Sequence, residues 1–187
     1  SVTALISASG VLEIEMLPPP LMVFFVLSLG VASGVAYSRL GTRIVTGVPL
    51  FALVGFQAFR LPLELVLHQW GIEGTLPVQM TYEGYNYDIV SGILGLVVGL
   101  VLWRRGPSLD KFSLGLAWAF NLIGLGLLAT VATIAVLSSP IPLRTFTDGP
   151  AVLLALHVPY GWIVPFCVGG ALTGHLLVFR WLKRHRG

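Results

Sequence analysis

Charged side chains are scarce in this sequence, because Asp, Glu, Lys and Arg make up only 10% of its 187 residues. A soluble domain carries about 25% of such residues. Hydrophobic residues instead reach 56%, and the mean hydropathy is +0.89. This composition excludes a soluble globular domain and predicts an integral membrane protein, with the lipid bilayer as its main partner and no nucleic acid.

Cysteine is also nearly absent, since Cys167 is the single one in the chain. One cysteine excludes an intrachain disulfide framework and a four-cysteine structural zinc site. The sequence also lacks a nucleophile elbow, a Walker loop, a dinucleotide fingerprint and a zinc motif. We therefore predict no metal site, and the sequence leaves any cofactor unknown.

Long apolar runs are what the sequence has in abundance. A transmembrane helix needs about 20 mainly apolar residues to cross a hydrocarbon core of about 30 Å. Five runs are predicted to do so, at about 21–37, 47–69, 89–103, 113–138 and 160–182. The third is short, which favours a thin local bilayer or a helix start near Tyr85. The predicted fold is all-α, a polytopic membrane helix bundle that forms a single domain over 1–187.

Residues 1–16 form a shorter apolar segment with about a dozen apolar residues, worth roughly 18 Å of helix. It cannot cross a membrane alone. The favoured interpretation is the outer end of a sixth, partial first helix. The alternative is a short interfacial segment that follows a cleaved signal peptide.

Basic residues predict the orientation, because Lys and Arg are retained on the cytoplasmic side of short loops. They gather in 38–46, 104–112 and 183–187, whereas 70–88 and 139–159 carry mostly acidic residues with Arg144 as their only base. We expect the first three segments to be cytoplasmic and the other two to face outward. This places the C-terminus in the cytoplasm and the protein in a plasma membrane.

The second apolar run contains two charged residues, Arg60 and Glu64. At 100° per residue they share a roughly 80° arc with Gln57 and His68, so a polar stripe is predicted to face the bundle interior. A charge at membrane depth costs at least about 2.5 to 3.5 kcal/mol on insertion scales. Arg60 and Glu64 should therefore neutralise each other or meet partners on other helices. Either a structural ion pair or a role in handling a ligand or ion fits this pattern.

Two further polar residues, Asn121 and His175, lie at similar depth in the last two runs. They are predicted to form an interhelical hydrogen bond, and the alternative is a role in a proton relay.

The two outward segments contain the densest polar chemistry. Residues 76–88 combine Gln79, Glu83, Asn86 and Asp88 with three tyrosines, and Arg144 lies in the proline-rich segment 138–150. Solvated loops with a helix cap are one explanation. The other is an outward pocket above the second run, with a predicted ligand-binding set of Arg60, Glu64, Gln79, Glu83, Asn86, Asp88 and Arg144. The excess of acid favours a cationic or amphipathic ligand, although two arginines could instead hold a carboxylate or phosphate.

These motifs also carry a family likeness. An Arg and a Glu four residues apart precede a QMT-aromatic-EG-x-N-aromatic-D block, matched by Arg60, Glu64 and residues 79–84 and 86–88. From about Phe56 onward the chain resembles an uncharacterised family of small bacterial multi-pass membrane proteins with about six helices. The likeness implies a bacterial inner-membrane location and the six-helix count. The basic residue usual after EG is replaced by Tyr85, and no activity comes with the resemblance.

Three classes of function remain. The first, which we favour, is a small transporter, channel or ligand binder with an outward-facing polar pocket for a small ligand, ion or lipid. The second is an accessory subunit of a larger membrane complex. The third is a membrane enzyme acting on a lipid or quinone, in which Glu64 and Glu83 would serve as acid and base.

Overall fold

The structure is a computed structural model that describes residues 2–13, 19–106 and 110–185. Within these ranges the chain is helical and contains no strand. Four helical stretches are long and apolar enough to cross a membrane: Pro20–Tyr37, Leu50–Ile72, Lys111–Ser138 and Tyr160–Arg184. The predicted all-helical bundle is thus confirmed. Residues 14–16 of the predicted N-terminal segment and Arg186 of the predicted basic tail lie outside the described ranges.

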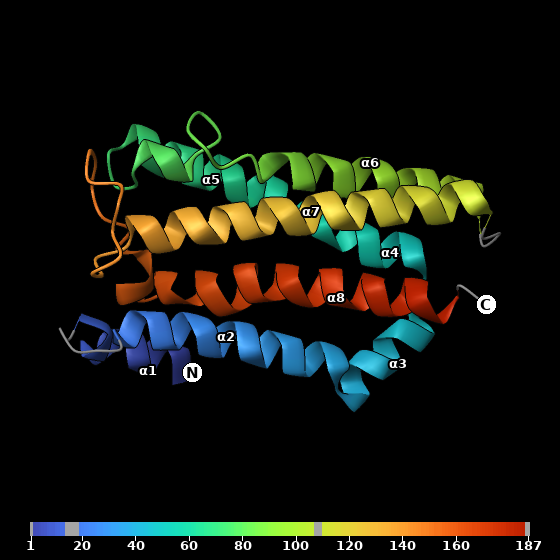
Figure 1. The fold of residues 1–187 in the computed structure, drawn as a ribbon, viewed down its shortest axis with the longest axis horizontal. Coiled ribbons are helices and arrows are strands. Elements are labelled where there is room, and N and C mark those ends of the chain that lie inside the picture. Colours follow the sequence, from blue (N-terminus) through green and yellow to red (C-terminus); the bar gives the residue numbers. More distant parts are fainter. Residues whose placement is uncertain (1, 14–18, 107–109, 186–187) are drawn as a thin grey trace.

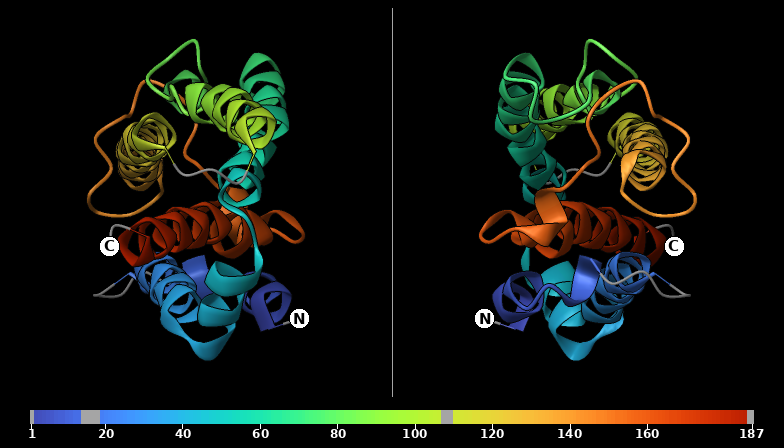
Figure 2. Two further views of the ribbon diagram at one scale, coloured as in Figure 1. Left: turned by 90° about the vertical axis from the view of Figure 1, so that its right-hand side faces the viewer. Right: turned by 90° about the vertical axis from the view of Figure 1, so that its left-hand side faces the viewer.

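The bundle is built around its last helix. Helix α8 (Gly169–Arg184) lies between α2 (Pro20–Tyr37) and α7 (Lys111–Ser138), and it contacts both (Figure 1). Helix α4 (Leu50–Gly55) also packs against α8, and α6 (Ile89–Arg105) packs against α4, α5 (Arg60–Ile72) and α7 (Figure 2). We call the end that carries segments 73–88 and 139–159 the loop end. The opposite end carries most of the basic residues and is called the basic end.

A short helix missed by the sequence prediction lies at the basic end. Helix α3 (Arg39–Gly47) occupies most of the stretch 38–46, which was expected to be a loop. Its N-terminus is capped by Ser38, whose hydroxyl accepts hydrogen bonds from the backbone N–H groups of Leu40 and Gly41. Because the next helix begins only after Pro49, the second span begins at Leu50, three residues later than predicted.

Helix α6 is shorter than the four long stretches. It has 17 residues, which amounts to about 25 Å of helix at 1.5 Å per residue. It begins near the middle of α7, and the chain between α5 and α6 runs from the loop end to that point (Figure 1). We call this connection, residues 73–88, the descending segment. The sequence predicts a loop at one end of the bundle here, whereas the structure buries Leu76, Met80, Thr81 and Asn86 inside it. Irregular backbone at membrane depth is tolerated where protein surrounds it.

Glycines bring α6 unusually close to the second span. A Cβ atom added at Gly92 would lie 2.6 Å from the backbone nitrogen of Leu61, and one at Gly99 would lie 2.9 Å from Cα of Gly55. Side chains larger than hydrogen would therefore force the two segments apart. This close approach sets the start of α6 beside Arg60.

The N-terminal segment packs at the loop end. Helix α1 (Val2–Ala8) and the 3₁₀ turn Val11–Glu13 precede α2, and Ser7 donates a hydrogen bond to the carbonyl oxygen of Ala155 (3.0 Å). With seven residues, α1 is too short to cross a membrane, as the sequence predicted.

Candidate functional site

The charged residue Arg60 lies at the centre of the bundle with 1% of its surface exposed. Its Nη2 atom is 2.6 Å from Oδ1 of Asp88, the residue that precedes α6. Asp88 is itself only 4% exposed. The main partner of Arg60 is therefore Asp88 rather than Glu64. The i, i+4 spacing places Arg60 and Glu64 on one face of α5, but the fold brings a better-placed carboxylate from a distant segment.

Arg60 also connects to the pair Asn121 and His175. Its Nη1 atom lies 3.2 Å from Nε2 of His175 and donates to the carbonyl oxygen of Gly124 (3.4 Å). Because a guanidinium has no acceptor, Nε2 of His175 must accept this hydrogen bond. The ring proton is thus on Nδ1, which donates to Oδ1 of Asn121 (2.8 Å). The geometry defines a neutral imidazole held by hydrogen bonds on both sides.

Glu64 is held by a different partner. Asn86 donates from Nδ2 to Oε2 of Glu64 (2.7 Å) and to the carbonyl oxygen of Met80 (3.0 Å), while its Oδ1 accepts from the backbone N–H of Asp88 (3.1 Å). Glu64 and Asn86 are 1% and 0% exposed. One amide side chain thus links the Glu64 carboxylate to the backbone of Asp88. We call the connected set the polar network: Arg60, Glu64, Asn86, Asp88, Asn121 and His175.

Two departures from α-helical geometry surround this network. A 3₁₀ turn, Phe56–Phe59, separates α4 from α5, and within it Gln57 donates to the carbonyl oxygen of Ala171 (3.0 Å). A π-helical turn, Ile163–Val168, precedes α8 and contains Pro165. Such turns occur often at functional sites because they redirect side chains from a regular helix face.

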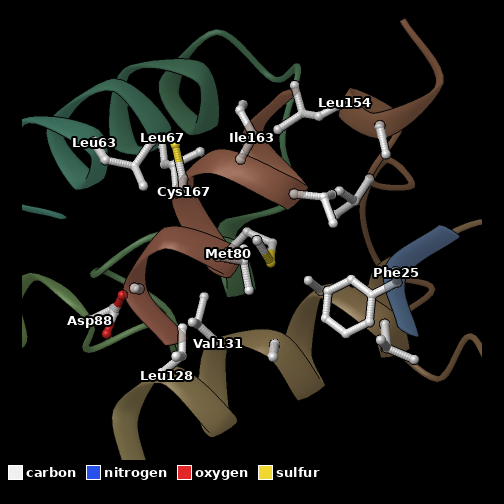
Figure 3. A pocket seen from close by; sticks show the side chains of 18 of the residues that line it. Phe25, Leu63, Leu67, Met80, Asp88, Leu128, Val131, Leu154, Ile163 and Cys167 are labelled. Atoms are coloured by element: carbon white, nitrogen blue, oxygen red, sulfur yellow. The ribbon is translucent and has the colours of Figure 1, made fainter. Parts of the chain in front are cut away.

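A cavity of about 100 Å³ lies over part of the polar network. Arg60, Glu64 and Asp88 line it together with apolar side chains from α2, α5, α7 and the π-helical turn. Figure 3 shows Asp88 at one end of this cavity, with Phe25 and Leu154 at the other, and Cys167 among the side chains between. Its walls are almost entirely apolar, so charged groups are confined to its floor.

The cavity extends toward the loop end. Its lining runs from Leu128 and Ala171, near the polar network, to Val152, Leu154 and Tyr160, which belong to the segments at the loop end. The half of the bundle between the network and the loops is therefore hollowed.

The structure brings together four of the seven residues predicted to bind a ligand: Arg60, Glu64, Asn86 and Asp88. The other three lie elsewhere. The Glu83 side chain is 64% exposed, with one carboxylate oxygen 3.8 Å from His68. Gln79 is half-buried in the descending segment and is not among the described residues that line the cavity.

Arg144 also lies away from the cavity. Its guanidinium donates to the carbonyl oxygens of Phe146 (3.0 Å) and Gly149 (2.6 Å) and so braces its own loop. The predicted placement of Arg144 over Arg60 and Glu64 is therefore wrong. An arginine in a loop can donate to carbonyl oxygens of that same loop, and the sequence did not show that Arg144 does so.

The sequence analysis did not assign Cys167, Asn121 or His175 to the ligand-binding set. The sequence analysis assigned Cys167 no role in a site, but it is half-buried and lines the cavity. Asn121 and His175 were expected as an isolated pair, whereas Arg60 joins them to the two carboxylates. Matching depth along the spans was the signal that could have linked them. No group of three or more His, Cys, Asp or Glu side chains that could hold a metal occurs in the part of the chain that the structure describes.

Comparison with known proteins adds no family to this geometry: no family model matches the chain, and neither a curated protein nor a solved structure matches it.

Proposed function

We propose that the chain is a multi-pass membrane protein that binds a small ligand in the cavity above the polar network, as a small transporter, channel or ligand binder. The observation that carries this proposal is the cavity itself, whose apolar walls end on Arg60, Glu64 and Asp88. Ligand sites are typically concave and mostly apolar, with a few convergent polar groups that orient the ligand. Ionisable residues inside membrane bundles usually serve function, because they are costly to bury.

The proposed topology has five spans, with α6 and the descending segment together forming the third. The loop end faces outward and the C-terminus lies in the cytoplasm, which is supported by the basic side chains of Arg39, Arg43, Arg105 and Arg184 at the other end. The bacterial inner membrane is the proposed location, on the strength of the family resemblance. In this orientation the cavity is entered from outside, past Val152, Leu154 and Tyr160.

The test is to fill the cavity with a larger side chain and to measure whether bound small molecules are lost. Ala132 lines the cavity from α7, so Ala132→Phe should occupy much of its volume. Ala129 lies on the same helix but is exposed on the outer surface, which makes Ala129→Phe a matched control. Each protein is extracted from its membrane without prior delipidation, and its bound small molecules are identified by native mass spectrometry.

We expect a molecule bound to the unmodified chain and to Ala129→Phe that is absent from Ala132→Phe. Identical bound species in all three proteins, with the two variants folded by circular dichroism, would contradict the proposal.

A further inference from the structure

We infer that the ligand of this cavity is a small organic cation, an amine or quaternary ammonium that carries an apolar group, with Glu64 as its counter-charge. This inference rests on the proposed function, because it assigns the charge of the ligand that the cavity binds. It follows from three observations: the balance of charges on the cavity floor, the partners of Arg60 and the position of Arg144 away from the cavity.

The floor contains more acid than base. One arginine, Arg60, faces two carboxylates, Glu64 and Asp88, and the three line the same cavity. His175 adds no positive charge, because its Nε2 atom accepts a hydrogen bond from Arg60. With all three groups ionised, the floor carries one uncompensated negative charge.

That charge is on Glu64. Arg60 directs Nη2 to Asp88, and Nη1 to the neutral acceptors His175 and Gly124. Among the described residues no basic nitrogen lies within 4.0 Å of a Glu64 carboxylate oxygen. The partner that the structure shows for Glu64 is the uncharged amide of Asn86 (2.7 Å), which orients the carboxylate without neutralising it.

A buried carboxylate in this position requires a proton or a cation. An unpaired charge at membrane depth costs at least about 2.5 to 3.5 kcal/mol. The groups that face Glu64 are Arg60 from the same helix, Asn86 and Asp88 from the descending segment, and His175 from α8 through Arg60. A cationic ligand replaces the proton on Glu64, and that proton is released to water. The apolar part of the ligand then contacts Leu, Val and Phe side chains of the walls.

An anion would find no such site. Holding a carboxylate or phosphate in two-point fashion needs free donors from two cationic side chains or a bidentate arginine. Arg60 already faces Asp88, and Arg144 donates to carbonyl oxygens of its own loop. The geometry therefore favours a cation over an anion.

The test compares three probes of similar shape. Benzyltrimethylammonium is the cation, neopentylbenzene is its neutral carbon analogue, and phenylmethanesulfonate is an anion. Binding of each to the full chain in detergent micelles is measured by equilibrium dialysis, with uptake by protein-free micelles subtracted. We expect the cation to bind at least about tenfold more tightly than the neutral analogue, which corresponds to about 1.4 kcal/mol.

Two variants locate the effect. Glu64→Gln should reduce the tenfold preference to about one, because the amide keeps the shape of the side chain and removes its charge. Glu83→Gln removes the same charge from an exposed side chain and should leave the preference unchanged. If Glu64→Gln does not fold, the three-probe comparison on the unmodified chain still tests whether the cavity prefers a cation.

The outcomes separate the inference from the proposed function. Equal binding of the cation and the neutral analogue, or tightest binding of the anion, overturns the cationic assignment and leaves the cavity as a ligand site. If none of the three probes binds, the inference is overturned. The mass-spectrometric comparison of Ala132→Phe with Ala129→Phe then shows whether the proposed function fails with it.

Discussion

The two halves of the bundle are built differently. At the basic end, Val54, Ala117, Val178 and Leu182 belong to one apolar core in which each is completely buried, and the helices that carry them are regular. In the loop-end half the π-helical turn Ile163–Val168 precedes α8, and the 3₁₀ turn Phe56–Phe59 lies near the middle of the bundle, directly before Arg60. The polar network and the cavity lie between and beside these turns.

The difference shows which half of the bundle departs from regular helices packed around an apolar core. Regular α-helices satisfy their own backbone groups, so they can bury an apolar core in a membrane without help from side chains. The loop-end half instead buries charged side chains beside a cavity, whereas the groove that Val35, Ile44 and Leu177 line toward the basic end contains no charged side chain among the described residues. Because buried charges and unfilled space are costly to fold, the proposed ligand site is placed in this half.

The largest expected effect comes from removing Arg60. Arg60→Ala strands the carboxylate of Asp88, which is 4% exposed, and breaking a buried ion pair in this way costs about 3–5 kcal/mol. At the basic end Arg43 is exposed, so Arg43→Ala should change stability by less than about 0.5 kcal/mol. Reversible unfolding in mixed micelles measures both free energies.

The double variant Arg60→Ala/Asp88→Asn is the control for this interaction. We expect it to lose less stability than the sum of the single changes, because removing both charges leaves none unpaired. Strictly additive losses would show that the two side chains do not interact.

Truncating a core leucine should cost less than removing Arg60 and should distinguish the halves. Leu182 is 0% exposed within the packed core, so Leu182→Ala should cost about 2 kcal/mol through lost packing contacts. Leu67 borders the existing cavity, and Leu67→Ala should cost about half as much because fewer contacts are lost. Equal losses in the same unfolding assay would indicate that the loop-end half is as densely packed as the other.

A smaller effect is expected from α6. A Cβ atom at Gly92 would meet the backbone of Leu61 at 2.6 Å, so Gly92→Ala should destabilise by about 1 kcal/mol through overpacking. It should also weaken ligand binding by moving Asp88 away from Arg60. At Gly30 no atom lies within 4 Å of an added Cβ, so Gly30→Ala should be neutral or slightly stabilising. Destabilisation by both changes alike would refute the close approach of α6.

The smallest effect concerns Asp110, which caps α7 at the basic end. Its carboxylate accepts a hydrogen bond from the backbone N–H of Ser113 (2.9 Å), and hydrogen bonding from Ser113 lowers the pKa of Asp110. A lowered pKa contributes stability that is present above the ordinary Asp value of about 3.9 and is lost as the pH falls below it. Asp110→Asn should therefore flatten the decrease in melting temperature between pH 5 and pH 3 by a small amount. An unchanged pH profile would show that the cap does not contribute.

The sequence predicts the long helices well because apolar runs are a direct signature of membrane helices. The run predicted at 113–138 forms Lys111–Ser138, and the run at 21–37 forms Pro20–Tyr37. The prediction from sequence fails at α3, because its nine residues are too few and too polar to be recognised as an apolar run. It also misses the descent of residues 76–88 into the bundle, because that path depends on packing against helices distant in the sequence.

The candidate site is predictable in part for the same reason. Arg60 and Glu64 stand out as charges inside an apolar run, so their burial follows from the sequence. Whether Asn86 or Glu83 turns inward does not follow, because both belong to the same polar segment. The structure buries Asn86 and exposes Glu83, and it pairs Arg60 with Asp88 instead of its neighbour on the helix.

The central claim is that the loop-end half contains a cavity that small molecules enter from outside, and Cys167 offers the most direct measurement. It is the single cysteine of the chain and lines the cavity, so 2-(trimethylammonio)ethyl methanethiosulfonate, a cation that does not cross the bilayer, reports entry from outside when it is added to intact cells. We predict that Cys167 is modified in the unmodified chain and in Ala129→Phe, and at least about tenfold more slowly in Ala132→Phe. Equal labelling rates in the three proteins, or no labelling in any of them, would contradict the account.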